Sequence, residues 1–110
     1  MGKETLGEFE LMVLLAAMRL GEENAYALAI VDEITERTGR SVRRSAVHVT
    51  LKRLEQKKLI ETWLGEPRTE RGGKARRHVR IAPAGAVAIH DSRLALERMW
   101  GGLDTVPERG

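Results

Sequence analysis

Hydrophobic residues recur along the chain at two spacings. Four stretches carry them at the three- and four-residue spacing of a helix, which predicts helices over Glu8–Leu20, Ala25–Thr38, Ala46–Lys57 and Ala84–Trp100. Two shorter stretches, Leu59–Leu64 and Arg77–Ala82, alternate or are rich in β-forming residues, which predicts strands. A polar, Gly-rich segment separates the strands, so we expect an antiparallel hairpin with a long tip.

Residues that start and stop helices flank these stretches. Gly21 follows the first predicted helix and Gly39 the second, where glycine commonly ends a helix. Asn24 and Ser45 are expected N-caps of the second and third helices. Pro83 fits the first turn of the last helix.

The first three predicted helices differ in their apolar faces. The first is apolar nearly all round, so it should be buried on more than one side. In the second, the inward stripe is expected to be Leu28, Val31 and either Ile34 or Ile30. In the third, Val47, Leu51 and Leu54 fall within about 60° of one another and should be buried.

The third helix should offer a mixed polar and cationic surface on its other side. His48 and Arg53 flank that surface. Its centre comprises Ser45, Val49, Lys52 and Gln56.

The last predicted helix carries two apolar stripes, which implies two packing partners. We expect Val87 and Leu94 to face the helix's own domain. The second stripe should pack against the first helix of a second copy, and the residues of this expected interface are Met12, Leu15, Ile89, Leu96 and Trp100.

Charge is distributed unevenly. Residues 1–39 hold 3 basic and 8 acidic side chains, residues 40–80 hold 13 and 4, and residues 81–110 hold 3 and 4. The net charge of +3 therefore conceals a strongly basic middle third. A polyanion is the expected partner of such a segment, and double-stranded nucleic acid is the commonest one.

Three helices followed by a basic hairpin is the order of a winged helix-turn-helix. We therefore predict a mainly α fold with a two-stranded β-wing, in which residues 6–82 bind DNA and residues 83–103 form a C-terminal dimerisation helix. The third helix would enter the major groove and the wing would reach phosphates or the minor groove. The expected DNA-binding residues are Arg43, Arg44, Ser45, His48, Val49, Lys52, Arg53, Arg71, Lys74, Arg76 and Arg77.

Two of these residues have alternative roles. Arg53 could pair with Glu10 or another acidic neighbour instead of DNA. His48 is a candidate reader of bases, and a surface or packing histidine is the alternative.

The same segments resemble the PadR family of bacterial transcriptional regulators. The sequence VRRSAVHVTLKRLEQKKLIETWLGE is similar to that family's recognition helix, which ends in LxRLExxGLI. ERGGKARRHVRIAPAG is similar to its GGRxRKYY-like wing and TxxG turn. The matching residues are Leu51, Arg53, Leu54, Glu55, Leu59, Ile60, Gly72, Gly73, Lys74, Arg76, Arg77, Pro83, Ala84 and Gly85.

The resemblance covers roughly residues 6 to 100, and the single C-terminal helix is similar to the shorter PadR subfamily. It implies a homodimer, joined through the first and last helices, that represses transcription from a palindromic operator. It also implies that a small aromatic effector binds near Trp100. Ser45 and His48 stand where the family has Gly and Tyr, and Lys58 stands where Gly is common.

Other classes of function find little support. The chain has no cysteine, and its three histidines lack ligand spacing, so we expect no metal and no cofactor. Gly72-Gly73-Lys74 lacks the flanking residues of a P-loop, and no catalytic constellation appears, so we expect no enzyme. An acidic N-terminus and apolar runs too short to span a bilayer lead us to expect a cytoplasmic protein without membrane contact.

Two other binding functions remain as alternatives to DNA binding. RNA recognition usually interleaves aromatic with basic residues, and Trp63 is the one aromatic residue in the basic third. A winged-helix module that binds proteins and not DNA is the other alternative, which the basic wing argues against.

Overall fold

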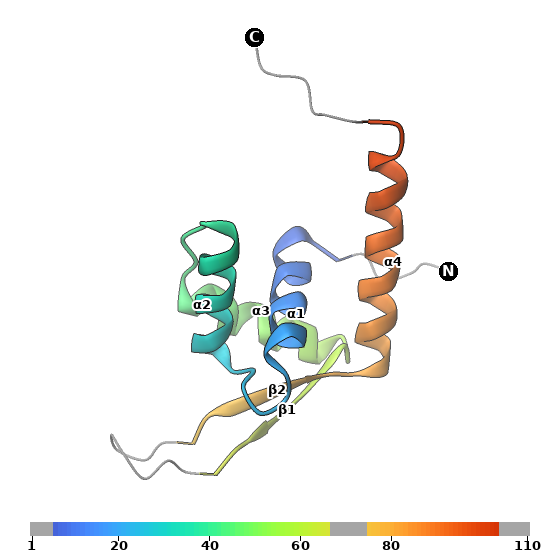
Figure 1. Cartoon of the computed structure of the whole chain (residues 1–110). Coiled ribbons are helices and arrows are strands. Elements are labelled where there is room, and N and C mark those ends of the chain that lie inside the picture. Colours follow the sequence, from blue (N-terminus) through green and yellow to red (C-terminus); the bar gives the residue numbers. More distant parts are fainter. Residues whose placement is uncertain (1–5, 67–74, 104–110) are drawn as a thin grey trace.

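The computed structural model describes residues 6–66 and 75–103. Its elements follow the predicted order and make a mainly helical fold with one antiparallel hairpin (Figure 1). They are α1 (Glu8–Leu20), α2 (Ala27–Thr38), α3 (Arg44–Gln56), β1 (Ile60–Leu64), β2 (Arg77–Ile81) and α4 (Pro83–Trp100). The predicted winged-helix architecture is confirmed.

Helix α1 lies at the centre of the molecule, between α2 and α4 (Figure 1). It packs against α2, α3, α4 and β2. Val13 and Leu14 are fully buried, and Ala16 and Ala17 nearly so. This confirms that a helix with little polar face is buried on several sides.

Helix α2 begins two residues later than predicted, because a tertiary hydrogen bond holds the preceding residues extended. Val79 of β2 donates its N–H to the carbonyl oxygen of Ala25 at 2.9 Å. Tyr26 therefore occupies the N-cap position, and Asn24 as the cap is wrong. The Asn24 amide donates back to the carbonyl of Leu20 instead, at 3.3 Å.

Helix α3 begins at Arg44 with Arg43 at its N-cap, so the predicted cap at Ser45 is also wrong. Ser45 lies in the first turn and is exposed. The predicted inward face is largely confirmed: Val47 and Leu54 are fully buried, while Leu51 is half-buried.

The inward face of α2 differs from the prediction at Leu28. Ala27, Ile30 and Ile34 are buried, whereas Leu28 is 45% exposed. Because the helix begins on extended residues tied to β2, the small Ala27 side chain meets the core and Leu28 is turned outward.

The two strands pair from Ile60 opposite Ile81 to Leu64 opposite Arg77. Side chains alternate across this hairpin, with Thr62 and Val79 paired on the face toward α3 and Trp63 and His78 paired on the other. Val79 is buried in the core, which anchors the base of the wing.

A tight junction joins α3, the hairpin and α4 at Leu59. Leu59 donates its N–H to Leu54 and accepts the N–H of Ala82, both at 3.0 Å. Lys58 just before it has a φ of 65°, the left-handed region that favours glycine. A Cβ on Gly85 would lie 2.1 Å from the Leu59 carbonyl oxygen, so only glycine permits this approach.

Helix α4 departs from its predicted faces at Val87 and Ile89, whereas Leu94 is half-buried and Leu96 and Trp100 are exposed, as expected. Gly85, Ala88 and Ile89 are buried against the domain, whereas Val87 is 59% exposed. The expectation that Val87 faces inward is wrong, and so is the placement of Ile89 in an exposed stripe. Small residues at Gly85 and Ala88 let the helix approach closely, and this selects the inward side.

No helix in the described part of the chain, residues 6–66 and 75–103, is long and apolar enough to cross a membrane.

Candidate nucleic-acid interface

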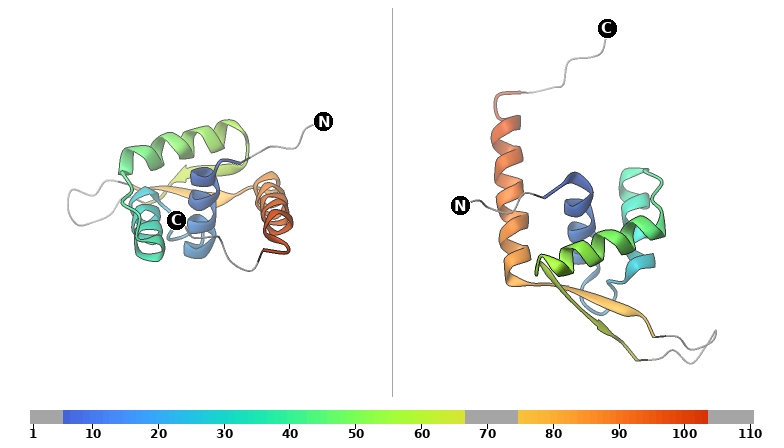
Figure 2. Two further views of the ribbon diagram at one scale, coloured as in Figure 1. Left: turned by 90° about the horizontal axis from the view of Figure 1, so that it is seen from above. Right: turned by 180° about the vertical axis from the view of Figure 1, so that it is seen from behind.

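Helix α3 presents an exposed polar face over its first three turns. No described residue forms a hydrogen bond or ion pair with the side chains of Arg43, Arg44 or Lys52, and Val49 is 57% exposed. Figure 2 shows α3 lying along one side of the molecule, with the hairpin projecting beyond it. The predicted residues that this face brings together are Arg43, Arg44, Ser45, His48, Val49 and Lys52.

Two consecutive side-chain hydrogen bonds connect the wing to α3. Arg77 donates to the Thr62 hydroxyl at 3.0 Å, and that hydroxyl donates to the Glu55 carboxylate at 2.7 Å. Arg76 lies over the ring of Tyr26, with its guanidinium carbon 4.1 Å from the ring centroid. Arg71 and Lys74, the other predicted wing residues, lie outside the described residues.

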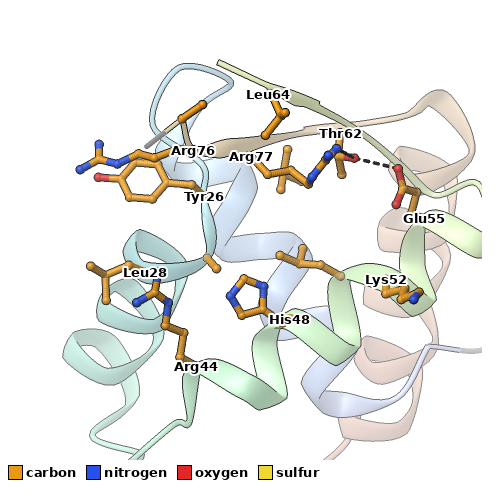
Figure 3. A pocket seen from close by; sticks show the side chains of 14 residues that line it. Tyr26, Leu28, Arg44, His48, Lys52, Glu55, Thr62, Leu64, Arg76 and Arg77 are labelled. Carbon is orange, nitrogen blue, oxygen red and sulfur yellow. Dashed lines mark hydrogen bonds between the residues drawn. The ribbon is translucent and has the colours of Figure 1, made fainter. Parts of the chain in front are cut away.

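A cleft of about 630 Å³ separates α3 from the wing (Figure 3). His48 and Lys52 line it from α3, and Arg76 and Arg77 line it from the opposite side. Glu55 is the one carboxylate among its described lining residues, and Thr62 hydrogen-bonds to it. The predicted recognition helix and wing therefore flank one positively charged hollow.

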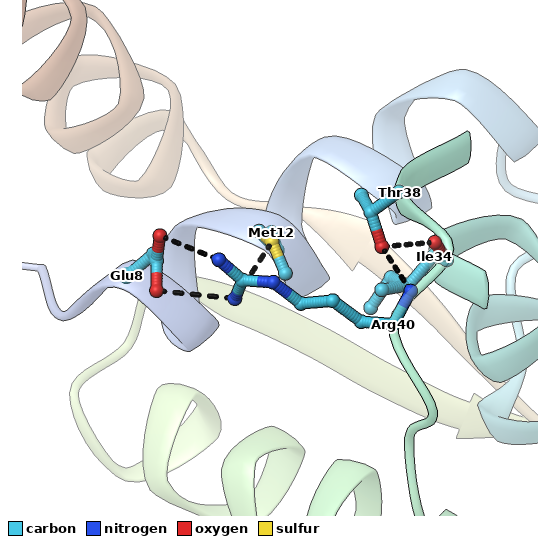
Figure 4. Close-up of polar contacts among 5 residues, drawn as sticks. All are labelled: Glu8, Met12, Ile34, Thr38 and Arg40. Carbon is cyan, nitrogen blue, oxygen red and sulfur yellow. Dashed lines mark hydrogen bonds and ion pairs between the residues drawn. The ribbon is translucent and has the colours of Figure 1, made fainter. Parts of the chain in front are cut away.

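Other cations of the basic third are held by carboxylates. Arg40 donates through both terminal nitrogens to the Glu8 carboxylate, each at 3.1 Å, and it also contacts the Met12 sulfur (Figure 4). This bidentate contact lowers the pKa of Glu8. Arg80 pairs with Glu61 at 2.8 Å. Neither arginine is as available to a polyanion as those on the face of α3.

Glu10 is a buried carboxylate that ties α1 to the end of α3. Lys57 donates to one of its oxygens at 3.0 Å, and the Gly7 N–H donates to the other at 2.9 Å. Burial raises the pKa of Glu10, but these hydrogen bonds and the charges of Lys57 and Arg53 outweigh it, so the pKa lies below its ordinary value. Lys57 is thus the ion-pair partner of Glu10, and the charge of Arg53 acts on the same carboxylate.

An aromatic and cationic stack covers the other face of the wing, and the sequence patterns did not reveal it. Trp63 stacks on His78 with ring centroids 5.6 Å apart, and Tyr26 meets His78 edge-on at 6.1 Å. His78 also donates from Nδ1 to the carbonyl of Glu22 at 3.1 Å. The signal available in the sequence was the strand alternation that puts Trp63 and His78 on one face; Tyr26 is distant along the chain and gave none.

The predicted dimer residues do not all lie at the surface. Leu15, Leu96 and Trp100 are 38%, 50% and 52% exposed, whereas Met12 is half-buried and Ile89 is only 8% exposed. The second half of α4 extends beyond α1, as Figure 1 shows. Its residues from Ala95 to Trp100 are all exposed in the single chain.

Among residues 6–66 and 75–103, no cluster of three or more histidine or acidic side chains has the arrangement of a metal site.

The fold is that of several solved transcription regulators. A PadR-family regulator from Clostridium difficile R20291 aligns over 84% of this chain and 91% of its own, with a TM-score of 0.68 and 17% identity. A PadR-like transcription factor from Bacteroides fragilis aligns over 83% and 82%, with a TM-score of 0.69 and 21% identity. Bacillus subtilis PadR, solved in complex with operator DNA, has a TM-score of 0.65 and 17% identity over 93% of this chain and 52% of its own.

Neither the protein-family models nor the curated proteins include a match to the sequence. The class defined by these observations is a winged helix with a C-terminal helix, built as in PadR-family transcription regulators. The resemblance seen in the sequence motifs is confirmed at the level of the fold.

Proposed function

We propose that this chain is a DNA-binding transcription regulator that acts as a homodimer. The observation that carries the proposal is the exposed cationic face of α3 next to a wing that carries further cations on the same side. A helix of this kind fits the major groove, and the flanking wing would contact the phosphate backbone. The neighbour solved with operator DNA supports this arrangement.

The two predicted parts of the chain would have separate tasks. Residues 6–82 would bind DNA, with His48, Val49 and Lys52 nearest the base edges and Arg43, Arg44 and the wing arginines on phosphates. Residues 83–103 would hold two copies together, so that the pair reads a palindromic site. A repressor role follows if the bound dimer blocks the promoter.

The exposed apolar side chains on α1 and α4 support the homodimer. Soluble monomers rarely expose large contiguous apolar patches. The exposed large side chains on these two helices are Leu15, Met18, Val87, Leu96, Met99 and Trp100. A second copy that packs its α1 against the C-terminal half of this α4 would cover Leu96, Met99 and Trp100, and a flat aromatic effector could insert beside Trp100. Val87 lies on the other side of α4 from Leu96, because nine residues separate them.

Salt dependence of DNA binding tests the proposal. A dimer that neutralises about 6–10 phosphates should show a log–log slope of about −5 to −9 for the affinity against salt concentration. A slope near zero, or no binding to any duplex from a random pool, would contradict it and favour a protein-interaction module.

Substitutions can separate base readout from phosphate contact. Lys52→Ala and His48→Ala should change the preference among selected sequences, whereas Lys74→Ala should weaken all sequences about equally. Arg37→Ala is a control, because Arg37 already pairs with Glu33 at 2.6 Å on α2. Wing substitutions that destroyed binding to one sequence alone would contradict this division.

A further inference from the structure

Val49 is an apolar side chain at the centre of the exposed cationic face of α3. It is 57% exposed, and helical spacing places it about 160° from the fully buried Val47, so it points almost directly away from the core. By the same spacing Lys52 and Arg53, which are both exposed, flank it on either side. An aliphatic side chain therefore projects from the middle of a positively charged surface.

Neither packing nor helix formation accounts for a valine at this position. Most of the side chain lies in solvent, and a β-branched residue favours a helix slightly less than lysine or glutamine does. Val49 is also not among the residues that line the cleft between α3 and the wing, although its neighbours His48 and Lys52 are. It lies instead on the outer side of α3, from which a side chain can enter a groove.

The place of Val49 along α3 is the one from which bases are contacted. It is the sixth residue of a helix that begins at Arg44, so it lies in the N-terminal half. In helix-turn-helix proteins, residues near the N-terminus of the recognition helix contact base edges. Single exposed apolar residues are common on protein surfaces, but this one is at the centre of the face that we propose to enter the major groove.

The chemistry of valine selects one feature of the major groove. The edges of guanine, cytosine and adenine present hydrogen-bond donors and acceptors there, whereas thymine adds an apolar group, its C5 methyl. Valine has neither a donor nor an acceptor in its side chain. Over a polar base edge it would displace water without replacing the lost hydrogen bonds, which is unfavourable. Over the methyl group it would remove apolar surface from water, which is favourable.

We propose that Val49 is a specificity-determining residue that recognises thymine through its C5 methyl group. Each half-site of the DNA would then contain a thymine that faces Val49. This inference rests on the proposed function, because it assigns one base within the DNA that α3 would bind. It adds an apolar contact to the polar contacts expected from His48 and Lys52.

Replacing thymine with uracil tests the inference, because the two bases differ only in the methyl group. The duplex would be one that the full chain selects from a random pool, and uracil would replace its thymines one at a time. At one thymine of each half-site, uracil should weaken binding about fourfold, as expected for one buried methyl group, and about fifteenfold when both half-sites are changed. Tight binding of a selected duplex that no uracil weakens would overturn the inference and leave the proposed function standing.

Val49→Ser would assign the methyl contact to this residue. Serine and valine have similar helix propensities and the position is exposed, so thermal unfolding should be nearly unchanged. The variant should bind the thymine and uracil duplexes nearly equally, because it lacks the two methyl groups of valine.

Val87→Ser is the matched control, since it makes the same change at a 59% exposed position on α4 and should keep the fourfold preference for thymine. A preference that Val49→Ser retains in full would assign the methyl contact to another residue and overturn the inference. A chain that selects no duplex from the pool would contradict the inference and the proposed function together.

Discussion

Single residues at the C-terminal end of α3 fix how this helix meets the rest of the domain. The Glu10 carboxylate holds Lys57 from the side of α1, and Lys58 turns the chain with a φ of 65°. Glu10 and Lys58 act on the orientation of α3 from outside the surface that we propose to bind DNA. Their substitution should therefore change stability more than DNA specificity.

Replacing Glu10 with glutamine should lower the free energy of unfolding by about 1–3 kcal/mol near neutral pH. The amide can still accept the Gly7 N–H, but it removes the negative charge that pairs with Lys57. Since the folded protein lowers the pKa of Glu10 below 4.5, this stabilisation is complete above pH 4.5 and is lost as the pH falls further. Urea unfolding at several pH values would show the two proteins converging in acid.

Glu8→Gln is the control, because its pair with Arg40 is largely exposed. Its unfolding midpoint should shift less than that of Glu10→Gln. An equal shift for both variants would show that burial of Glu10 adds nothing.

Replacing Lys58 with glycine should stabilise the protein by about 1 kcal/mol, because glycine adopts a positive φ without the steric cost that lysine carries. Lys58→Ala removes the same side chain but keeps the Cβ, so it should bring no such gain. Thermal unfolding of the three proteins measures this difference. A gain of the same size in the alanine variant would assign the effect to charge and not to the backbone.

At the scale of elements, the sequence predicted each helix and strand, but it did not predict correctly which side of α2 and of α4 is buried. The bounds of α1 are as predicted, because its apolar run ends at Gly21. The start of α2 was missed because it depends on the bond between Val79 and Ala25, residues distant along the chain. On α3 the exposed positions His48 and Lys52 follow from helical spacing, whereas Arg44 was expected from the charge pattern, ahead of a helix predicted to begin at Ala46.

Helix α4 shows why periodicity has a limit. Two apolar stripes identify two packing surfaces, but large side chains do not say which surface faces inward. Gly85 decides it, because its close approach to the Leu59 carbonyl oxygen leaves no room for a Cβ. A close backbone contact of this kind cannot be predicted from the spacing of hydrophobic residues.

Gly85→Ala should therefore destabilise the fold by about 1–3 kcal/mol, since the added methyl group would overlap the Leu59 carbonyl oxygen. Gly101→Ala is the matched control: its Cβ would meet its nearest neighbours at 3.5 Å, an ordinary contact. Urea unfolding of both variants measures the difference. Equal stability of the two would show that α4 can shift away from Leu59 without cost.

At the scale of the whole molecule, the exposed end of α4 predicts the assembly. Trp100→Ala should raise the dissociation constant of the dimer at least about a hundredfold, because truncating a buried tryptophan typically costs about 3–5 kcal/mol. Sedimentation would measure it, with DNA binding recorded in parallel. Val49→Ala, equally exposed on α3, should leave the dimer intact. A monomeric wild type would contradict the prediction.

The junction at Leu59 has a consequence for the spacing of the DNA site. The backbone of Leu59 contacts the end of α3, Ala82 just before α4, and Gly85 in the first turn of α4. The proposed recognition helix therefore cannot pivot freely against the helix that would join the two copies. The dimer would then hold its two α3 helices at a fixed separation and a fixed rotation about the DNA axis, about one turn of DNA apart. One extra base pair between half-sites rotates them by about 34–36°, and we expect that single insertion to abolish tight binding in a gel-shift assay.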